Sequence, residues 1–326
     1  MDTGYRRPAH PARRLDQLRQ YGSFSLAYST LQDGLKYFET DDGYLAYAMY
    51  LGSPFVLADP VAPAPVWPQL VGRFLKEYPH SCFCQVSRPM AALLVRHGYA
   101  VNEFGTDFRL HVPTYEFSGT NKFHIRYAER VLNRSGFRIA ELPEAAVCWA
   151  GVRGVSDRWK LGRRSQTRET TFLSRPIVFA EEVDTRKFFV LGPDGVVAFV
   201  FFDPIYRAGQ VIGYLSNAKR YLESAPEGFD YAVTKRALEI FRREGKALLH
   251  LGAAPFHGVT DSEFPANPIT SWLSRFFYPR KWLYNFRGIA EHKARYRGEA
   301  EKIYIATRKK FPVIELIRLA RVCNAM

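Results

Sequence analysis

Residues 191–202, LGPDGVVAFVFF, place an Asp-Gly pair between runs of aromatic and β-branched residues. Asp-Gly permits the positive φ angles of a tight hairpin turn, and such flanks are typical of paired strands. Residues 38–50, FETDDGYLAYAMY, repeat the pattern: Asp42-Gly43 and Asp194-Gly195 superpose without a gap at a distance of 152 residues. Two such hairpins half a chain apart predict duplicated domains of about 150 residues each.

The elements expected after the two hairpins come in a similar order. In the first half we expect a strand ending in FVLADP, then a helix over 66–77, a strand over 81–87, a helix over 90–97 and a strand over 106–112. In the second half we expect a strand over 209–217, a helix over 230–245, a strand over 246–255, a helix over 282–297 and a strand over 301–307. Two further helices are expected between the halves, over 121–136 and 144–160. The fold class is therefore α+β, with mixed central sheets that carry helices on both faces.

Composition bounds the function classes. An apolar share of 47% excludes a disordered chain, and a formal net charge of +14 predicts an anionic partner such as nucleic acid, an acidic membrane surface or a phosphate-rich cofactor. A basic surface without function is the alternative. The four cysteines form no pair at zinc-ligand spacing, so we expect no metal. We see neither a signal peptide in residues 1–20 nor an apolar run of the roughly 20 residues that a spanning helix needs. These features favour a cytoplasmic protein that is soluble or peripheral.

Several motifs together resemble one family. The segments SDRWKLGRR (156–164), LHLGAAPFHGV (249–259) and YNFRGIAEHKARYR (284–297), with IYIA (303–306), are similar to the catalytic domain of phosphatidylglycerol lysyltransferases. The first-half segment YFETDDGYLAYAMYLGSPFVLADPVAP (37–63) is similar to the same domain. The resemblance covers residues 24–308 and implies two tandem domains of the N-acyltransferase (GNAT) fold. It also implies transfer of an aminoacyl group from aminoacyl-tRNA to an acceptor that is usually a lipid head group.

The expected organisation has five parts. Residues 1–23 form a basic N-terminal arm, 24–117 the first GNAT-like domain, 118–140 a linking helix, 141–308 the second and catalytic domain, and 309–326 an amphipathic C-terminal helix. That last helix either lies on an anionic bilayer or docks its apolar face on the second domain. A soluble metabolite remains an alternative acceptor.

The GNAT resemblance assigns the acyl site to the strand that ends in Gly-Ala-Ala-Pro. In this fold the central strand separates from its neighbour, and its exposed backbone receives the acyl group. Gly252, Ala253 and Ala254 leave room for the donor ester, and Pro255 stops further pairing. His257 is our first candidate for the general base because its ordinary pKa is near neutral, and Asp261 would orient it or bind the aminoacyl ammonium. In the alternative, His257 caps a loop; His250 we expect to be a core histidine.

Charge favours tRNA as the donor. No Q/R-x-x-G-x-G/A loop, the pyrophosphate cradle of acyl-CoA-dependent relatives, precedes the helix near Asp230, although acyl-CoA remains the alternative donor. From Arg275 to Met326 there are 13 Arg and Lys against four Glu, interleaved with aromatic residues that suit unpaired bases. No cofactor is expected. The residues that we assign to tRNA are Trp159, Lys160, Arg163, Arg164, Asn285, Arg287, Lys293 and Arg295; for such charges a solvated helix face is the alternative.

One motif departs from the family. Lysyl-transferring members tend to carry Asp-Leu-Met-Arg in the strand before the second-domain helix, whereas this chain has Tyr214-Leu215-Ser216-Asn217. Without that acid, a neutral transferred amino acid becomes plausible, and we assign Tyr214 and Asn217 to substrate binding. A chain that binds RNA or a membrane without catalysis is the remaining alternative.

Overall fold

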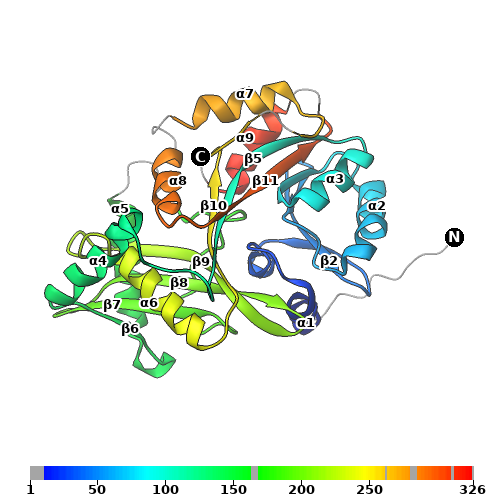
Figure 1. Ribbon diagram of the computed structural model, residues 1–326. Coiled ribbons are helices and arrows are strands. Elements are labelled where there is room, and N and C mark those ends of the chain that lie inside the picture. The colour runs from blue at the N-terminus through cyan, green and yellow to red at the C-terminus, as the bar shows by residue number, and fades with distance from the viewer. Residues whose placement is uncertain (1–10, 163–167, 261–262, 280–284, 310–311, 325–326) are drawn as a thin grey trace.

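The computed structural model describes residues 11–162, 168–260, 263–279, 285–309 and 312–324. Within these ranges the strands join into one eleven-stranded sheet in the order β1-β2-β3-β4-β11-β5-β10-β9-β8-β7-β6 (Figure 1). The strands are β1 (Lys36–Glu39), β2 (Tyr44–Tyr50), β3 (Ser53–Leu57), β4 (Cys82–Val86), β5 (Ala100–His111), β6 (Arg138–Glu141), β7 (Arg186–Gly192), β8 (Gly195–Arg207), β9 (Gln210–Tyr221), β10 (Leu248–Pro255) and β11 (Glu299–Thr307).

Both predicted hairpins are confirmed. β1 and β2 pair antiparallel up to Glu39 and Tyr44, across the turn that contains Asp42-Gly43. β7 and β8 pair up to Gly192 and Gly195, and Gly195 takes a φ of +117°, which a residue with a side chain rarely adopts. The Asp-Gly pairs therefore set the register of the outer strands in each half of the sheet.

The two halves of the chain exchange their final strands. β11, near the end of the chain, lies between β4 and β5 of the first half and pairs antiparallel with both. β5, from the first half, in turn pairs antiparallel with β10 of the second half from Gly105 to His111. Because β11 lies among first-half strands and β5 pairs with a second-half strand, the sheet is continuous. Its centre therefore contains strands from both halves of the chain.

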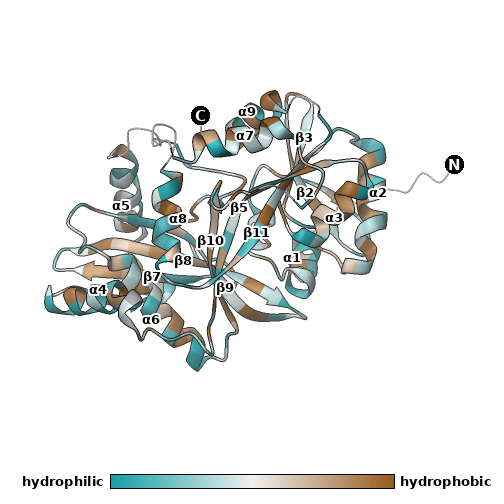
Figure 2. Cartoon of the chain, turned by 45° about the horizontal axis from the view of Figure 1, so that its top comes forward, coloured by the Kyte–Doolittle hydropathy of each residue, from teal (hydrophilic) through white to brown (hydrophobic). Residues whose placement is uncertain are grey.

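Helices cover both faces of the sheet (Figures 1 and 2). They are α1 (Pro11–Tyr21), α2 (Trp67–Glu77), α3 (Arg88–Arg96), α4 (Phe123–Arg134), α5 (Trp149–Leu161), α6 (Phe229–Arg243), α7 (Pro268–Phe277), α8 (Phe286–Ala294) and α9 (Val313–Val322). The sequence predicted α2, α3, α4, α5, α6, α8 and α9, with shifted ends, but not α7, the short strand β6 or α1, which lies where a basic arm was expected.

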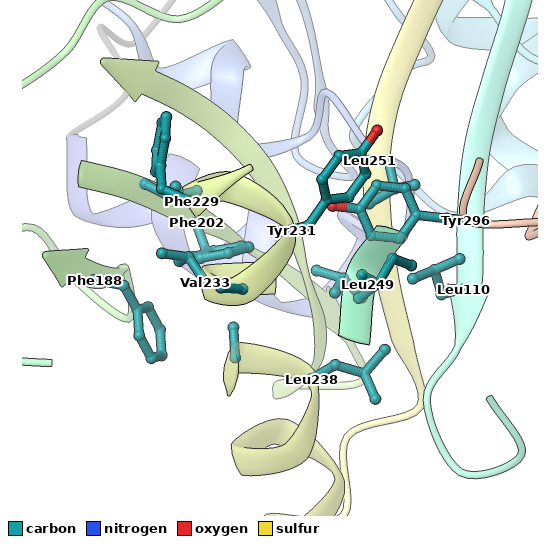
Figure 3. Close-up of a cluster of buried hydrophobic side chains, with 14 of the residues drawn as sticks. Leu110, Phe188, Phe202, Phe229, Tyr231, Val233, Leu238, Leu249, Leu251 and Tyr296 are labelled. Atoms are coloured by element: carbon teal, nitrogen blue, oxygen red, sulfur yellow. The ribbon is translucent and has the colours of Figure 1, made fainter. Parts of the chain in front are cut away.

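Large apolar cores lie under these helices. α2 and α3 bury Phe74 and Leu94 against one face of the first half, and α6 buries Leu238 in the same cluster as Phe188 and Phe202 of the second (Figure 3). Each such side chain contributes about 1.5–3 kcal/mol when it is fully buried. These cores hold the two halves of the sheet rigidly around the central strands β5, β10 and β11.

Helix α9 docks on the molecule rather than standing apart from it. Leu319 is buried in a cluster with residues of the first-half strands, whereas Ile314 and Ile317 on the same helix are about half exposed. The helix thus docks on the protein, as one alternative expected, but on a cluster formed largely by first-half strands rather than on the second domain alone, and an apolar strip remains exposed. In the described part of the chain, no helix has the length and apolarity needed to cross a bilayer.

Candidate functional site: an opening in the sheet at Gly252

The sheet opens between β9 and β10. β10 pairs parallel with β9 only from Leu248 to His250, then continues to Pro255 along β5 alone. The strands therefore separate at the Gly-Ala-Ala tract, as predicted. Gly252 takes a φ of +81° at a bulge, and a Cβ there would lie 3.4 Å from both the Leu215 side chain and the Lys293 Nζ atom. Glycine thus provides both the strained turn and the space beside it.

A cavity of about 580 Å³ fills this opening. Its walls come from β9, β10, α7, α8 and α9, together with first-half residues such as Ser25 and Phe104. Most of the wall is apolar, and its charged member among the described residues is Lys293; no carboxylate lines it there. The cavity therefore suits a largely uncharged substrate group placed near one amine.

Lys293 places that amine at the exposed backbone of β10. Helix α8, which carries it, begins where the Asn285 side chain accepts a hydrogen bond from Gly288 N at 3.1 Å. The Lys293 Nζ atom donates to the Ala253 carbonyl at 2.7 Å. Burial and the neighbouring Lys219 lower the pKa of Lys293, against the opposing effect of Asp107, to about 7. An amine with this pKa is able to accept a proton near neutral pH.

Asp107 and His250 lie next to this amine. Asp107 on β5 stands opposite Ala253 in the antiparallel register, and its Oδ2 atom is 3.4 Å from His250 Nδ1. Burial raises the pKa of the Asp107 carboxyl, but His250, Ser25 and Lys293 lower it by more, so the net pKa lies below its usual value. A carboxylate is thus held close to the opening. His250 is a buried core histidine with a partner, as expected.

His257 does not line the cavity, so the expectation that it faces the opening is wrong. Phe256 takes a φ of +63° and occupies the cavity wall in its place. The His257 ring packs near Phe108 and Tyr278, with Nδ1 3.4 Å from the Thr106 hydroxyl. Burial and Lys302 lower its pKa. Asp261, its expected partner, lies outside the described residues.

The other expected substrate residues divide into two groups. Gly252, Ala253 and Asn217 line the cavity, and Asn217 Nδ2 also donates to the Arg175 carbonyl at 3.3 Å. Ala254 and Tyr214 do not line it. Ala254 is buried in the core, and Tyr214 stacks on Phe241 with a ring separation of 4.3 Å. These two assignments are corrected, because the bulge and the packing against α6 turn both residues into the core.

The residues on and around α8 that were assigned to tRNA do not form a single basic surface. Asn285 caps the helix and is exposed, whereas the ammonium of Lys293 lines the cavity and does not lie on the basic outer surface that the sequence predicted for it. Arg287 is exposed and pairs with Glu291 at 2.7 Å. Arg295 follows the helix end, and its Nη1 atom lies 3.3 Å from the Tyr231 hydroxyl.

The second basic group lies on α5. Lys160 pairs with Asp157 at 2.9 Å, and the Arg220 guanidinium stacks over the Trp159 ring at 3.9 Å. Arg163 and Arg164 lie outside the described residues. Of the residues assigned to tRNA that the structure describes, Arg287 and Arg295 are exposed, on and directly after the helix that carries Lys293.

The N-terminus of α6 is occupied by the protein's own carboxylate. Asp230 pairs with Lys219 and with His292, each at 3.0 Å. Burial opposes ionisation of this carboxyl, but Lys219 and His292 hold its pKa well below the usual value. A helix N-terminus is the usual position for a phosphate, and a fixed carboxylate there repels a pyrophosphate.

Comparison with known proteins identifies the family. The family model described as "Phosphatidylglycerol lysyltransferase, C-terminal" matches residues 15–307. A phosphatidylglycerol lysyltransferase of Bacillus subtilis (strain 168) is 25% identical over 321 residues, which are 92% of this chain and 35% of that protein. The chain thus spans about a third of the length of that relative.

Solved structures share the fold. The structure of L-PGS from Bacillus licheniformis has a TM-score of 0.80 at 21% identity, with 97% of each chain covered. The C-terminal domain of a putative lysylphosphatidylglycerol synthetase from Agrobacterium fabrum has a TM-score of 0.76 at 17% identity, covering 97% of this chain and 96% of that one. Since the family model spans most of its length, the chain belongs to the family of phosphatidylglycerol lysyltransferase C-terminal domains.

Proposed function

We propose that the chain transfers an aminoacyl group from aminoacyl-tRNA to a hydroxyl of a lipid head group of the phosphatidylglycerol class. The observation that carries this proposal is the opening between β9 and β10, with the Lys293 amine on its wall. The family match and the relative named for lysyl transfer to phosphatidylglycerol support the same reaction class.

The reaction is a transesterification. The acceptor hydroxyl oxygen attacks the carbonyl carbon of the aminoacyl ester, a new ester bond forms, and the bond to the terminal ribose oxygen of tRNA breaks. Lys293, whose pKa is lowered to about 7, takes the proton of the attacking hydroxyl in its neutral form and returns a proton to the departing ribose oxygen. An aminoacyl ester is already activated, so positioning along β10 provides the remaining acceleration.

The transferred amino acid is uncharged in this proposal. A lysyl side chain would bring a second ammonium into a cavity whose described lining has Lys293 and no carboxylate. Repulsion between two such cations in an apolar enclosure is costly. Asn217, which lines the cavity, provides a neutral polar contact instead.

Helices α7 and α9 provide the surface that meets the lipid. Trp272 on α7 is 60% exposed, and Ile314 and Ile317 on α9 are 59% and 49% exposed. Val313 and Ile317 are exposed and also line the cavity, so the cavity reaches the surface along this apolar edge. Arg275 and Arg321 on the same helices add positive charge that favours an anionic bilayer. Since aminoacyl-tRNA is cytoplasmic, the reaction takes place at the cytoplasmic membrane surface.

The test is incubation of the purified protein with a mixture of charged tRNAs and phosphatidylglycerol vesicles, followed by mass analysis of lipids and soluble metabolites. We expect a lipid whose mass rises by one uncharged aminoacyl group, in a reaction abolished by RNase. Acyl transfer from acyl-CoA with none from charged tRNA would overturn the donor assignment. An aminoacylated soluble metabolite without modified lipid would overturn the acceptor assignment.

A further inference from the structure

A buried carboxylate oxygen beside the opening lacks a partner. Asp107 is 7% exposed, and its Oδ1 atom has no hydrogen-bond partner in the described part of the chain. Such an atom is costly to bury, and buried polar atoms in proteins nearly always have a partner. Its position is fixed, because the other oxygen, Oδ2, lies 3.4 Å from His250 Nδ1.

The surroundings of this oxygen point to the cavity. Asp107 stands opposite Ala253 across the β5–β10 register, and the Ala253 carbonyl accepts the hydrogen bond of Lys293. Ser25, which lines the cavity, lowers the pKa of the Asp107 carboxyl through a side-chain hydrogen bond. The unpaired oxygen is therefore close to the place where the proposed ester carbonyl would lie.

We propose that Asp107 Oδ1 binds the α-ammonium of the aminoacyl group, an inference that rests on the proposed function. Every aminoacyl-tRNA has an ammonium one carbon from the ester carbonyl, whatever its side chain. A carboxylate next to the carbonyl site accepts a charge-assisted hydrogen bond from that ammonium, and the ammonium is the partner that Oδ1 lacks. The same ammonium near Lys293 favours the neutral form of that amine, which is the form that accepts the proton.

Binding of the α-ammonium by Asp107 explains how a cavity that excludes a charged side chain still accepts the charged α-amino group of the substrate. Asp107 is a single carboxylate behind the cavity wall, opposite Ala253, and the described wall itself is uncharged apart from Lys293. Because β5 comes from the first half of the chain, this half supplies a substrate-binding residue and not only a scaffold.

The test compares two donors, an aminoacyl-tRNA and the same tRNA with an N-acetylated aminoacyl group, which carries no ammonium. We expect the wild-type protein to prefer the free-amino donor by ~10- to 100-fold in kcat/KM, the range for a hydrogen bond between charged groups. Asp107→Asn should lose that preference, through a higher KM for the free-amino donor and little change for the acetylated one.

Asp59→Asn is the matched control. Asp59 is another buried carboxylate of the first half, it accepts a hydrogen bond from Ser87 N at 2.9 Å, and apart from burial the groups that shift its pKa are Ser87 and Glu301 rather than Ser25 and Lys293. Asp59→Asn should keep the wild-type preference for the free-amino donor.

Three results separate the possible failures. Wild-type protein that uses both donors equally overturns the inference without any variant, even where Asp107→Asn fails to fold. An Asp107→Asn protein that keeps the preference but shifts its pH profile also overturns it, and would make Asp107 only the counterion of Lys293. Wild-type protein that uses neither donor contradicts the proposed function itself.

Discussion

Lys293 is the residue on which the proposed chemistry depends. A lysine normally stays protonated far above neutral pH, but burial beside the β10 backbone lowers the pKa of this one to about 7. Replacing Lys293 with Ala should slow transfer about 100-fold or more, the usual contribution of a general base. Single-turnover kinetics with charged tRNA and vesicles will measure the rate. His257→Ala is the control, and a large loss there with normal turnover of Lys293→Ala would reverse the two roles.

The same residue predicts the pH dependence. The amine is protonated below its pKa and accepts a proton only above it. The transfer rate should therefore rise as the pH increases through about 7 and level off above it. Rates measured from pH 5.5 to 8.5 in wild-type protein will show this limb. A rate that stays constant across this range would remove Lys293 as the base.

The sequence identified some of these residues and not others, for physical reasons. Gly252 and Ala253 were found because the resemblance to the GNAT fold places the acyl site at the end of this strand, where small residues leave room. His257 was misplaced because Phe256 turns the chain at a positive φ, which no local pattern announces. Lys293 was assigned to an exposed basic helix, since its low pKa arises only when α8 packs against β10. The sequence offered one indication of this role: Lys293 lies on the predicted helix that follows the Gly-Ala-Ala strand.

At the scale of elements, α7 and α9 carry the membrane prediction. The double variant Trp272→Ala, Ile317→Ser removes one exposed apolar side chain from each of the two helices. It should weaken binding to phosphatidylglycerol vesicles by about tenfold or more, because each side chain loses its burial in the bilayer interface. Vesicle co-sedimentation will measure the affinity. Leu161→Ala, at the exposed end of α5, is the control; an equal loss in that variant would show that the effect is not specific to α7 and α9.

The elements themselves could largely be predicted, whereas their pairing could not. Asp-Gly turns and apolar periodicity are local, so the hairpins and most helices were found. The partners of β5 and β11 depend on contacts between residues roughly 200 positions apart, as in the ion pair of Arg109 with Glu299 at 2.8 Å. No local pattern distinguishes a strand that pairs within its own half from one that pairs across.

For the whole molecule, the strand exchange predicts that the halves depend on each other. A fragment of residues 141–326 lacks β5, and its β10 and β11 would expose unpaired edges. We expect this fragment to be insoluble or unfolded when expressed alone, and co-expression with residues 1–140 to restore a soluble complex. Circular dichroism and size-exclusion chromatography will distinguish these outcomes. A fragment that folds cooperatively and transfers aminoacyl groups alone would contradict the joint construction of the site.

The most direct measurement is a crystal structure with an amide-linked aminoacyl-adenosine, which mimics the 3′ end of charged tRNA and resists transfer. The account predicts that its carbonyl lies in the opening between β9 and β10, against Gly252 and Ala253 and within reach of Lys293. Binding at another position, with the opening filled by side chains of the protein, would contradict the account.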